Sequence, residues 1–258
     1  MGDGAGRTNP ESPRSRGTFF AEVRDTLLPS LDGRDGPLPP MLVALTLVTG
    51  LVDAFSYLVL GHVFVANMTG NVVFIAFAIA GEPGFSITSS LIAVGFFIAG
   101  AFGGGLFASR AGDRRDRLLW RTTEVQALCV GGALVLSIAA GNPVPVGYTY
   151  PVISTLAVSM GLQNAMARRL GVPDLTTTVL TLTITGIGAD SRMAGGSGSK
   201  AGRRLVSVLA MFAGALLGVL AILHASVVYP LVMTFVVISI VSIAGRLLSR
   251  RHPAWVGK

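Results

Sequence analysis

Long apolar runs dominate this sequence and restrict its fold more than any other feature. Six runs approach or exceed the roughly 20 residues that an α-helix needs to cross a membrane: 41–60, 87–108, 122–140, 148–167, 203–223 and 227–248. Only 13% of the 258 residues are charged, whereas a soluble domain carries about 25% charged residues. The sequence therefore predicts an all-α integral membrane protein with about six transmembrane helices.

Two further apolar runs are irregular. The run 63–80 is interrupted by Asn67-Met68-Thr69-Gly70-Asn71, and the run 175–189 carries six threonines between Thr176 and Thr185. Asn and Thr are favoured at the N-termini of helices, and irregular backbone inside a membrane must be buried in protein or line a wet cavity. We predict two short broken or re-entrant segments here.

The distribution of basic residues predicts the topology. Lys and Arg gather in 110–121, 168–169, 192–204 and 246–258, and the links 81–86, 141–147 and 224–226 contain none. If six runs cross and the two irregular runs do not, every basic loop and both termini lie in the cytoplasm, as the positive-inside rule requires. The alternative is seven spans, with 63–80 crossing and the N-terminus outside.

The net charge of +7 comes mainly from Arg residues at the ends of apolar runs. We interpret it as a topology signal and expect no nucleic-acid partner. Residues 1–40 are predicted to be a mostly disordered cytoplasmic tail, although 18–31 could form a short amphipathic helix at the membrane surface. Residues 41–248 form the predicted transmembrane domain, and 249–258 a basic cytoplasmic tail.

A weak internal repeat divides the transmembrane domain. Gly50-Leu51-Val52-Asp53-Ala54 resembles Gly161-Leu162-Gln163-Asn164-Ala165, and each is followed by a Thr-bearing short segment and a Gly-rich span. Three crossings in each half would make the halves inverted relative to each other, with approximate bounds 41–120 and 121–248. Inverted repeats with broken helices at the midplane are typical of secondary transporters.

Asp53 is the main acidic residue inside a predicted span. A charge at that depth costs at least about 3 kcal/mol on insertion scales. Thr46, Thr49 and Ser56 share its helix face, so this face should contact protein or water. Asp53 is either a proton- or cation-coupling carboxylate or a structural group bonded to neighbouring helices.

The irregular segments supply the other candidate residues. If both re-enter, their helix N-termini meet at the midplane and form a site for an anionic or strongly dipolar solute; simple helix capping is the alternative. Gln163 and Asn164 either line this cavity or join helices, and Asp174 either lines it or caps a helix. The predicted solute or ion pathway comprises Asp53, Asn67, Thr69, Asn71, Gln163, Asn164, Asp174, Thr176, Thr177 and Thr178.

Other features predict packing rather than chemistry. The pairs Gly100/Gly104 and Gly214/Gly218 permit close helix packing within the bundle or, alternatively, along a homodimer seam. Arg168 and Arg169 are most simply cytoplasmic anchors. The single cysteine, the scattered histidines and the lack of a catalytic motif predict no metal, no cofactor and no enzymatic activity.

Three segments resemble the YoaK family of bacterial membrane proteins: Gly50–Leu58, Gly61–Asn71 and Gly161–Thr181, the last containing Val172-Pro173-Asp174-Leu175-Thr176-Thr177-Thr178. The resemblance covers roughly 40–248 and implies a multi-pass protein of the bacterial cytoplasmic membrane, without an established activity. We therefore expect a permease or channel-like transporter for a small polar or anionic solute, with coupling to protons through Asp53 as one option. A scaffold, sensor or lipid-interacting protein that transports nothing is the alternative.

Overall fold

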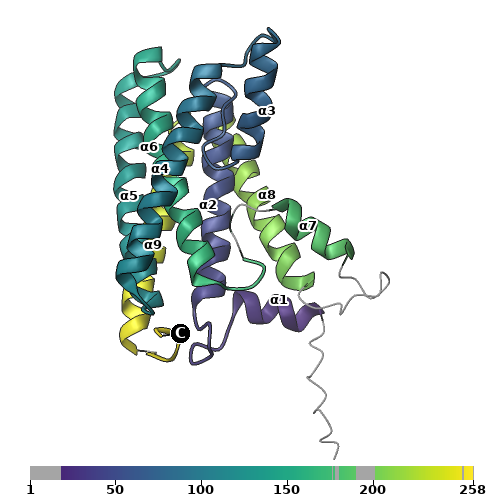
Figure 1. The fold of residues 1–258 in the computed structure, drawn as a ribbon, viewed down its shortest axis with the longest axis vertical. Coiled ribbons are helices and arrows are strands. Elements are labelled where there is room, and N and C mark those ends of the chain that lie inside the picture. Colours follow the sequence, from purple (N-terminus) through teal and green to yellow (C-terminus); the bar gives the residue numbers. More distant parts are fainter. Residues whose placement is uncertain (1–18, 176, 178–179, 190–200, 252, 258) are drawn as a thin grey trace, which may run out of the picture.

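All regular secondary structure in the described residues is helical (Figure 1). A computed structural model describes residues 19–175, 177, 180–189, 201–251 and 253–257. Its helices are α1 (Phe19–Leu27), α2 (Leu38–Val59), α3 (Met68–Ile79), α4 (Ile87–Ala111), α5 (Arg115–Ala140), α6 (Val146–Leu170), α7 (Leu180–Ala189), α8 (Ala201–His224) and α9 (Tyr229–Arg251), followed by the short 3-10 helix η2 (Pro253–Trp255).

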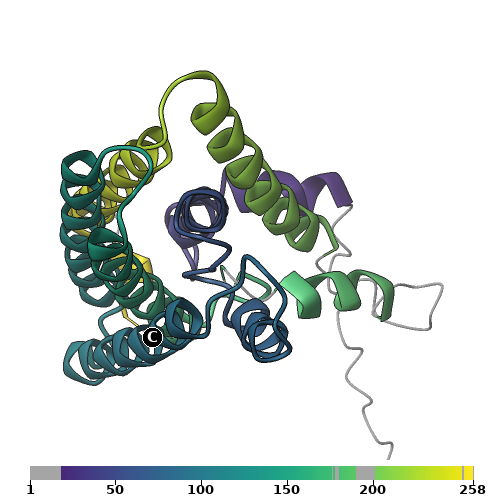
Figure 2. The ribbon, with the colours of Figure 1, turned by 90° about the horizontal axis from the view of Figure 1, so that it is seen from above.

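Six long helices form a bundle and correspond to the six runs predicted to cross (Figure 2). Five of them, α2, α4, α5, α8 and α9, are long and apolar enough to span a membrane. Helix α6 has 25 residues, about 38 Å at 1.5 Å per residue, but polar residues such as Gln163 and Asn164 make it less apolar. The predicted all-helical, multi-pass fold class is confirmed.

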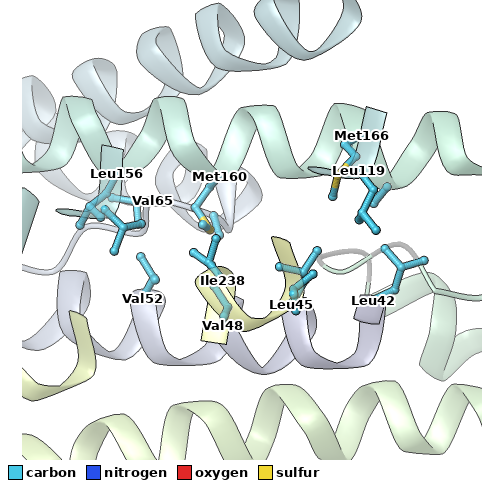
Figure 3. Close-up of a cluster of buried hydrophobic side chains, with 14 of the residues drawn as sticks. Leu42, Leu45, Val48, Val52, Val65, Leu119, Leu156, Met160, Met166 and Ile238 are labelled. Carbon is cyan, nitrogen blue, oxygen red and sulfur yellow. The ribbon is translucent and has the colours of Figure 1, made fainter. Parts of the chain in front are cut away.

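Helix α2 lies at the centre of the bundle (Figure 2). In its most apolar stretch 67% of the residues are buried, against 22–33% in the other four apolar spans. Leu45, Val48 and Val52 of α2 face Leu156 and Met160 of α6 in the core (Figure 3). The outer helices instead expose large apolar side chains, as expected where lipid covers the surface.

Helix α3 is a half-helix that enters and leaves at one end of the bundle. Its 12 residues extend about 18 Å, too short to cross. The chain returns into the bundle after α2, because Val65 and Ala66 bind Asp53 within that helix. It then leaves again, and Gly84 lies beside His62 at the end where α2 finishes, with 3.0 Å between His62 Nδ1 and the Gly84 carbonyl oxygen. The segment 63–80 is thus re-entrant, and the seven-span alternative does not describe it.

Both ends of the described chain lie at the same end of the bundle (Figure 1). There the buried guanidinium of Arg115 donates to Asp35 (3.0 Å) and to the Leu170 carbonyl oxygen (3.1 Å), and its backbone N–H donates to Val256. We call this the basic end, because the Arg-bearing termini of α4, α5, α6, α8 and α9 meet there. The opposite end contains the segment from 60 to 86, which includes α3, and the turns 141–145 and 225–228, all without Lys or Arg.

Part of the N-terminal segment is helical. Residues 19–27 form α1, which lies within the stretch 18–31 considered for a short amphipathic helix, the alternative to a mostly disordered tail; residues 1–18 lie outside the described part. Glu22 accepts a hydrogen bond from the backbone N–H of Gly202 (2.9 Å), and Thr26 is fully buried. Helix α8 supplies these contacts, and its distance of about 180 residues along the chain explains why local sequence did not reveal them.

Close contacts at glycines join α2 to α8 and α6 to α4 in the same pattern. A Cβ added to Gly50 would overlap the backbone of α8, and a Cβ added to Gly161 would overlap the backbone of α4. In the same way, a Cβ on Gly214 would overlap the backbone of α2, and a Cβ on Gly100 would overlap the backbone of α6. The contacting residues of α2 and α6 correspond by one shift in residue number: Leu47 with Val158, Gly50 with Gly161, Leu51 with Leu162 and Ala54 with Ala165. Those of α4 and α8 correspond by a second, slightly larger shift: Phe97 with Met211, Gly100 with Gly214, Ala101 with Ala215 and Gly104 with Gly218.

The helix neighbours follow the same correspondence. Helix α3 packs on α4 as α7 packs on α8, and α5 packs on α6 as α9 packs on α2. Helix α2 runs away from the basic end, and α6 runs toward it (Figure 1). Helices α2–α5 and their counterparts α6–α9 therefore run in opposite directions in the bundle.

Candidate functional site

A cavity of about 1410 Å³ lies between the start of α3 and helices α4, α6 and α7. It is lined by backbone or side chains of Ala66, Asn67, Met68, Thr69, Gly70, Val73, Phe97, Ala101, Gly105, Ala108, Ser109, Asn164, Ala165, Arg168, Arg169 and Thr181.

The lining residues show where the cavity lies along the bundle. Helices α4 and α6 contribute their C-terminal portions, ending near Ser109 and Arg169 at the basic end. The first turn of α3 contributes the other wall, at a depth close to Asp53, because Ala66 contacts that carboxylate. The cavity therefore extends from the basic end to about the depth of Asp53, along the side of the bundle where α3, α4, α6 and α7 lie.

The start of α3 points its polar groups at this cavity. Asn67 is the N-cap residue, and its side chain accepts a long hydrogen bond of 3.4 Å from the Gly70 backbone N–H. Asn67 and Thr69 are exposed and line the cavity. The first backbone N–H groups of a helix lack partners within the helix and form its positive end, so this wall can donate hydrogen bonds to a solute.

The charged residues of the cavity are two arginines from the end of α6. Arg168 and Arg169 are both exposed. No Asp or Glu belongs to the lining identified in the described part of the chain. The cavity combines amides, hydroxyls and positive charge, which suits a polar solute with hydrogen-bond acceptors.

Arg168 was interpreted as an anchor from the sequence, and its place in the cavity was missed. A signal for it existed, because Arg168 follows Asn164 by four residues. Residues at this spacing share a face of a helix, and Asn164 was already a pathway candidate. Asn164 does line the cavity, and its side-chain amide donates to the Met160 carbonyl oxygen (2.9 Å) of its own helix.

Asp53 does not line the cavity; it lies behind the wall that the start of α3 forms. Its Oδ1 accepts hydrogen bonds from the backbone N–H groups of Val65 (3.2 Å) and Ala66 (2.9 Å). The residue is only 5% exposed, and its Oδ2 has no hydrogen-bond partner among the described residues. In this conformation Asp53 fastens the segment that precedes the half-helix.

Asn71 is likewise separated from the cavity. Its side-chain amide donates to the Phe64 carbonyl oxygen (2.6 Å) and accepts from the Phe64 backbone N–H (2.9 Å), and it is fully buried. Asn71 therefore binds the extended segment to α3, and Asp53 binds the same segment to α2. The predicted grouping of Asn71 with the cavity-lining Asn67 and Thr69 is not what the structure shows.

Gln163 joins three helices instead of facing the cavity. Its Nε2 donates to Thr49 Oγ1 (3.0 Å) and to the Leu45 carbonyl oxygen (3.2 Å) of α2. Its Oε1 accepts from Gln126 Nε2 of α5 at 2.6 Å. Both glutamines are fully buried, so the pair connects α2, α5 and α6, which is the helix-joining alternative considered for this residue.

The second irregular segment contributes less to the cavity than predicted. Asp174 forms an ion pair with Arg204 of α8 (2.9 Å), and it does not cap a helix, because Thr177, three residues later, is not helical and has a positive φ of 57°. Thr177 is 4% exposed and does not belong to the cavity lining. Thr176 and Thr178 lie outside the described residues. Of the residues of this segment that the structure describes, Thr181 alone lines the cavity.

The four predicted packing glycines lie at contacts between helices of the bundle. Gly100 and Gly104 lie against α6, and Gly214 and Gly218 lie against α2. The described residues contain no group of three His, Cys, Asp or Glu side chains that could hold a metal ion.

Comparison with known proteins identifies relatives of this chain without identifying an activity. A family model described as "Protein of unknown function (DUF1275)" matches residues 41–244. The UPF0700 transmembrane protein YoaK of Bacillus subtilis (strain 168) is 34% identical over 151 residues, which are 57% of this chain. The match spans 64% of the length of that relative. No solved structure matches.

Proposed function

Because this chain belongs to the DUF1275 family of proteins of unknown function, we propose an activity from its cavity: a permease or channel-like transporter for a small polar or anionic solute. The observation that carries the proposal is the cavity of about 1410 Å³ that leads from the basic end to the start of a half-helix. Its amides, hydroxyls and arginines would be costly to expose to lipid. A solvated path for a solute accounts for them, and catalysis is no part of the proposal.

We propose that the basic end faces the cytoplasm of a bacterium. The arginines at the ends of five long helices favour this orientation by the positive-inside rule. The YoaK relative is a bacterial transmembrane protein, which supports placement in the cytoplasmic membrane. The cavity would then open to the cytoplasm, with both termini on the same side.

We also propose that the bundle is an inverted repeat of α2–α5 and α6–α9. The matched contacts at Gly50 and Gly161, and at Gly100 and Gly214, support it. This division groups α5 with the first half, so the boundary lies at the turn 141–145 and not near residue 120. Transporters built this way bind solutes near the membrane midplane, beside discontinuous helices. Helix α3 is such a helix.

Reconstituted protein would test the transport proposal. Purified protein in liposomes should accelerate the flux of at least one class in a panel of halides, small carboxylates and uncharged polyols, relative to empty liposomes. Asn164→Leu, which removes a polar group from the cavity, should reduce that flux at least about tenfold. Phe212→Leu, on a lipid-exposed face of α8, should leave it unchanged.

The outcomes separate transport from the scaffold or sensor alternative. Equal flux in empty and protein-containing liposomes for every probe class would contradict the transport proposal. Proton coupling through Asp53 has its own test in the same vesicles. If Asp53 carries the coupling proton, a pH gradient should drive uptake, and Asp53→Asn should abolish that dependence while passive exchange of solute remains.

A further inference from the structure

The matched contacts of the two halves give a rule for relating one half to the other. Gly50 contacts α8 as Gly161 contacts α4, and the residues around each correspond with one constant shift between α2 and α6 and another between α4 and α8. The rule relates α2 to α6 and α4 to α8, helix by helix. Each residue of α2, α4, α6 or α8 can therefore be assigned a counterpart on the matching helix, which runs in the opposite direction.

Applied to the cavity, the rule identifies an equivalent set of residues. On α6 the cavity is lined by Asn164, Ala165 and Arg168. Their counterparts on α2 are Asp53, Ala54 and Tyr57. On α4 the lining residues Phe97 and Ala101 correspond to Met211 and Ala215 of α8. Because α2 and α8 run away from the basic end, this equivalent set lies toward the opposite end.

The equivalent region is closed in this structure. Asp53 is 5% exposed and is covered by the backbone of Val65 and Ala66, which donate to its Oδ1. Ala54 is buried against Gly218 of α8. Tyr57 stacks on Phe64, with 5.2 Å between ring centroids. The segment before α3 thus covers the region from the opposite end.

One feature of the closed region is unexplained by packing. Asp53 Oδ2 is buried without a hydrogen-bond partner among the residues that the structure describes, which is an unfavourable state for a carboxylate oxygen. Its counterpart Asn164 lines an open cavity. An arrangement in which Asp53 faced water or a solute would give this oxygen partners.

We propose that the protein has a second conformation in which the halves exchange roles, and a crevice lined by Asp53, Tyr57 and Ala215 opens at the opposite end. This inference rests on the transport function proposed above. The crevice receives the same small polar solute as the cavity, and Asp53 Oδ2 accepts a hydrogen bond from it. Halves that make equivalent contacts can exchange conformations at little net cost, which is the basis of alternating access in inverted repeats.

Opening requires defined changes at the segment before α3. Val65 and Ala66 must leave Asp53, and Tyr57 must separate from Phe64. Helix α3 would move with this segment, because Asn71 binds both backbone groups of Phe64. The start of α3 would then leave the wall of the present cavity. Closure at one end and opening at the other are therefore coupled through the same segment.

Thiol labelling tests the second conformation. In a Cys129→Ser background, single cysteines replace Ala101, in the present cavity, and its counterpart Ala215. A membrane-impermeant maleimide is added from either side of vesicles of known orientation. We expect Ala101→Cys to react from the basic-end side and Ala215→Cys from the opposite side. Phe212→Cys, three residues before Ala215 on α8 and 64% exposed on the outer surface of the bundle, is the matched control and should stay inert.

The decisive readout is the dependence of one site on the other. In the double variant, a bulky maleimide bound at Ala101→Cys should hold the present conformation and slow labelling of Ala215→Cys about tenfold, within the usual range of coupling between sites. Met211→Cys, the counterpart of Phe97, provides a second reporter if Ala215→Cys disturbs folding. Monodisperse elution in detergent establishes that each variant is folded.

Three results would overturn the second conformation. An inert Ala215→Cys and Met211→Cys beside a reactive Ala101→Cys would overturn the second conformation and leave a transporter or channel with one fixed cavity. Labelling at Ala215→Cys that does not depend on the block at Ala101→Cys would indicate a continuous pore and also overturn the inference. If Ala101→Cys is inert from the basic-end side, the cavity is dry, and the proposed function fails together with the inference.

Discussion

At the scale of single residues, Asp53 explains how an irregular segment stays inside the bundle. Backbone N–H groups within a membrane need acceptors, because lipid offers none. Val65 and Ala66 lie in an extended segment that has no helical partners for these groups, and Asp53 Oδ1 accepts from both. The carboxylate thus replaces the hydrogen bonds that a helix would have supplied.

Replacing Asp53 should therefore destabilise the fold in proportion to the acceptors lost. Asp53→Ala leaves two buried donors unpaired and should lower the free energy of unfolding by about 2–6 kcal/mol, at about 1–3 kcal/mol for each. Asp53→Asn retains a carbonyl oxygen and should cost less. Thermal unfolding in detergent, followed by tryptophan fluorescence, measures the difference. Equal losses in both variants would mean that the charge, and not the acceptor, stabilises the segment.

A second residue-scale prediction concerns the buried glutamine pair. Gln126→Leu and Gln163→Leu each break the 2.6 Å bond between the side chains, so their effects on stability should not add. We expect a coupling energy of about 0.5–1.5 kcal/mol, typical of hydrogen bonds between membrane helices. Gln126→Leu combined with Thr155→Val, whose hydroxyl bonds within its own helix, should be additive. Strict additivity in the glutamine pair would contradict the assigned contact.

The sequence indicated which polar residues matter better than it indicated their partners. Asn67, Asn71, Gln163 and Asn164 all attract attention because polar groups in apolar runs are costly. Only three-dimensional proximity separates Asn67 and Asn164, which line the cavity, from Asn71 and Gln163, which bind backbone or other helices. The partner of Gln163, Gln126, is 37 residues away and carries no local signal.

At the scale of helices, glycine determines which pairs approach most closely. Gly100 faces the Val158 backbone so tightly that no Cβ fits between them. Gly95 lies on the same helix, is exposed and has open space around it. The two glycines share a helix and differ in their surroundings, so they form a natural comparison.

Gly100→Ala should weaken the contact between α4 and α6, whereas Gly95→Ala should not. We expect Gly100→Ala to lower the midpoint of thermal unfolding by several degrees, since overpacking costs about 1–3 kcal/mol. Gly95→Ala should leave the midpoint unchanged or raise it slightly, because Ala favours a helix by about 1 kcal/mol over Gly. The same unfolding assay checks both variants. An unchanged midpoint in Gly100→Ala would show that the helices can separate without loss.

Helix lengths explain why most of the bundle, but not its details, follows from the sequence. The six long helices match the six long apolar runs, because about 20 apolar residues allow few other structures in a membrane. Helix α3 also matches, since Asn67 is a good cap and the apolar part after it is short. Helix α7 is described from Leu180 onward, and Thr176 and Thr178 before it lie outside the described residues. Threonine hydroxyls can bond to nearby backbone groups, so their presence does not fix where a helix starts.

At the scale of the whole molecule, the basic end organises the topology. Arg115 links the loop before α2, the end of α6 and the C-terminal segment. Trp255 is fully buried against Gly36, which adopts a positive φ of 44°. Gly36 has no Cβ, and a side chain there would collide with the indole ring. The two ends of the described chain are thus packed together at one end of the bundle.

This packing requires an even number of crossings, which can be tested directly. A fluorescent protein that matures only in the cytoplasm, fused separately to the N-terminus and to the C-terminus, should fluoresce in both cases. Alkaline phosphatase, which is active only outside the cytoplasm, should be inactive at both positions and active when inserted in the turn 141–145. Six crossings, with α3 and α7 re-entrant, give this pattern. Seven crossings would place the two termini on different sides, and the contact between Trp255 and Gly36 could not exist in the membrane.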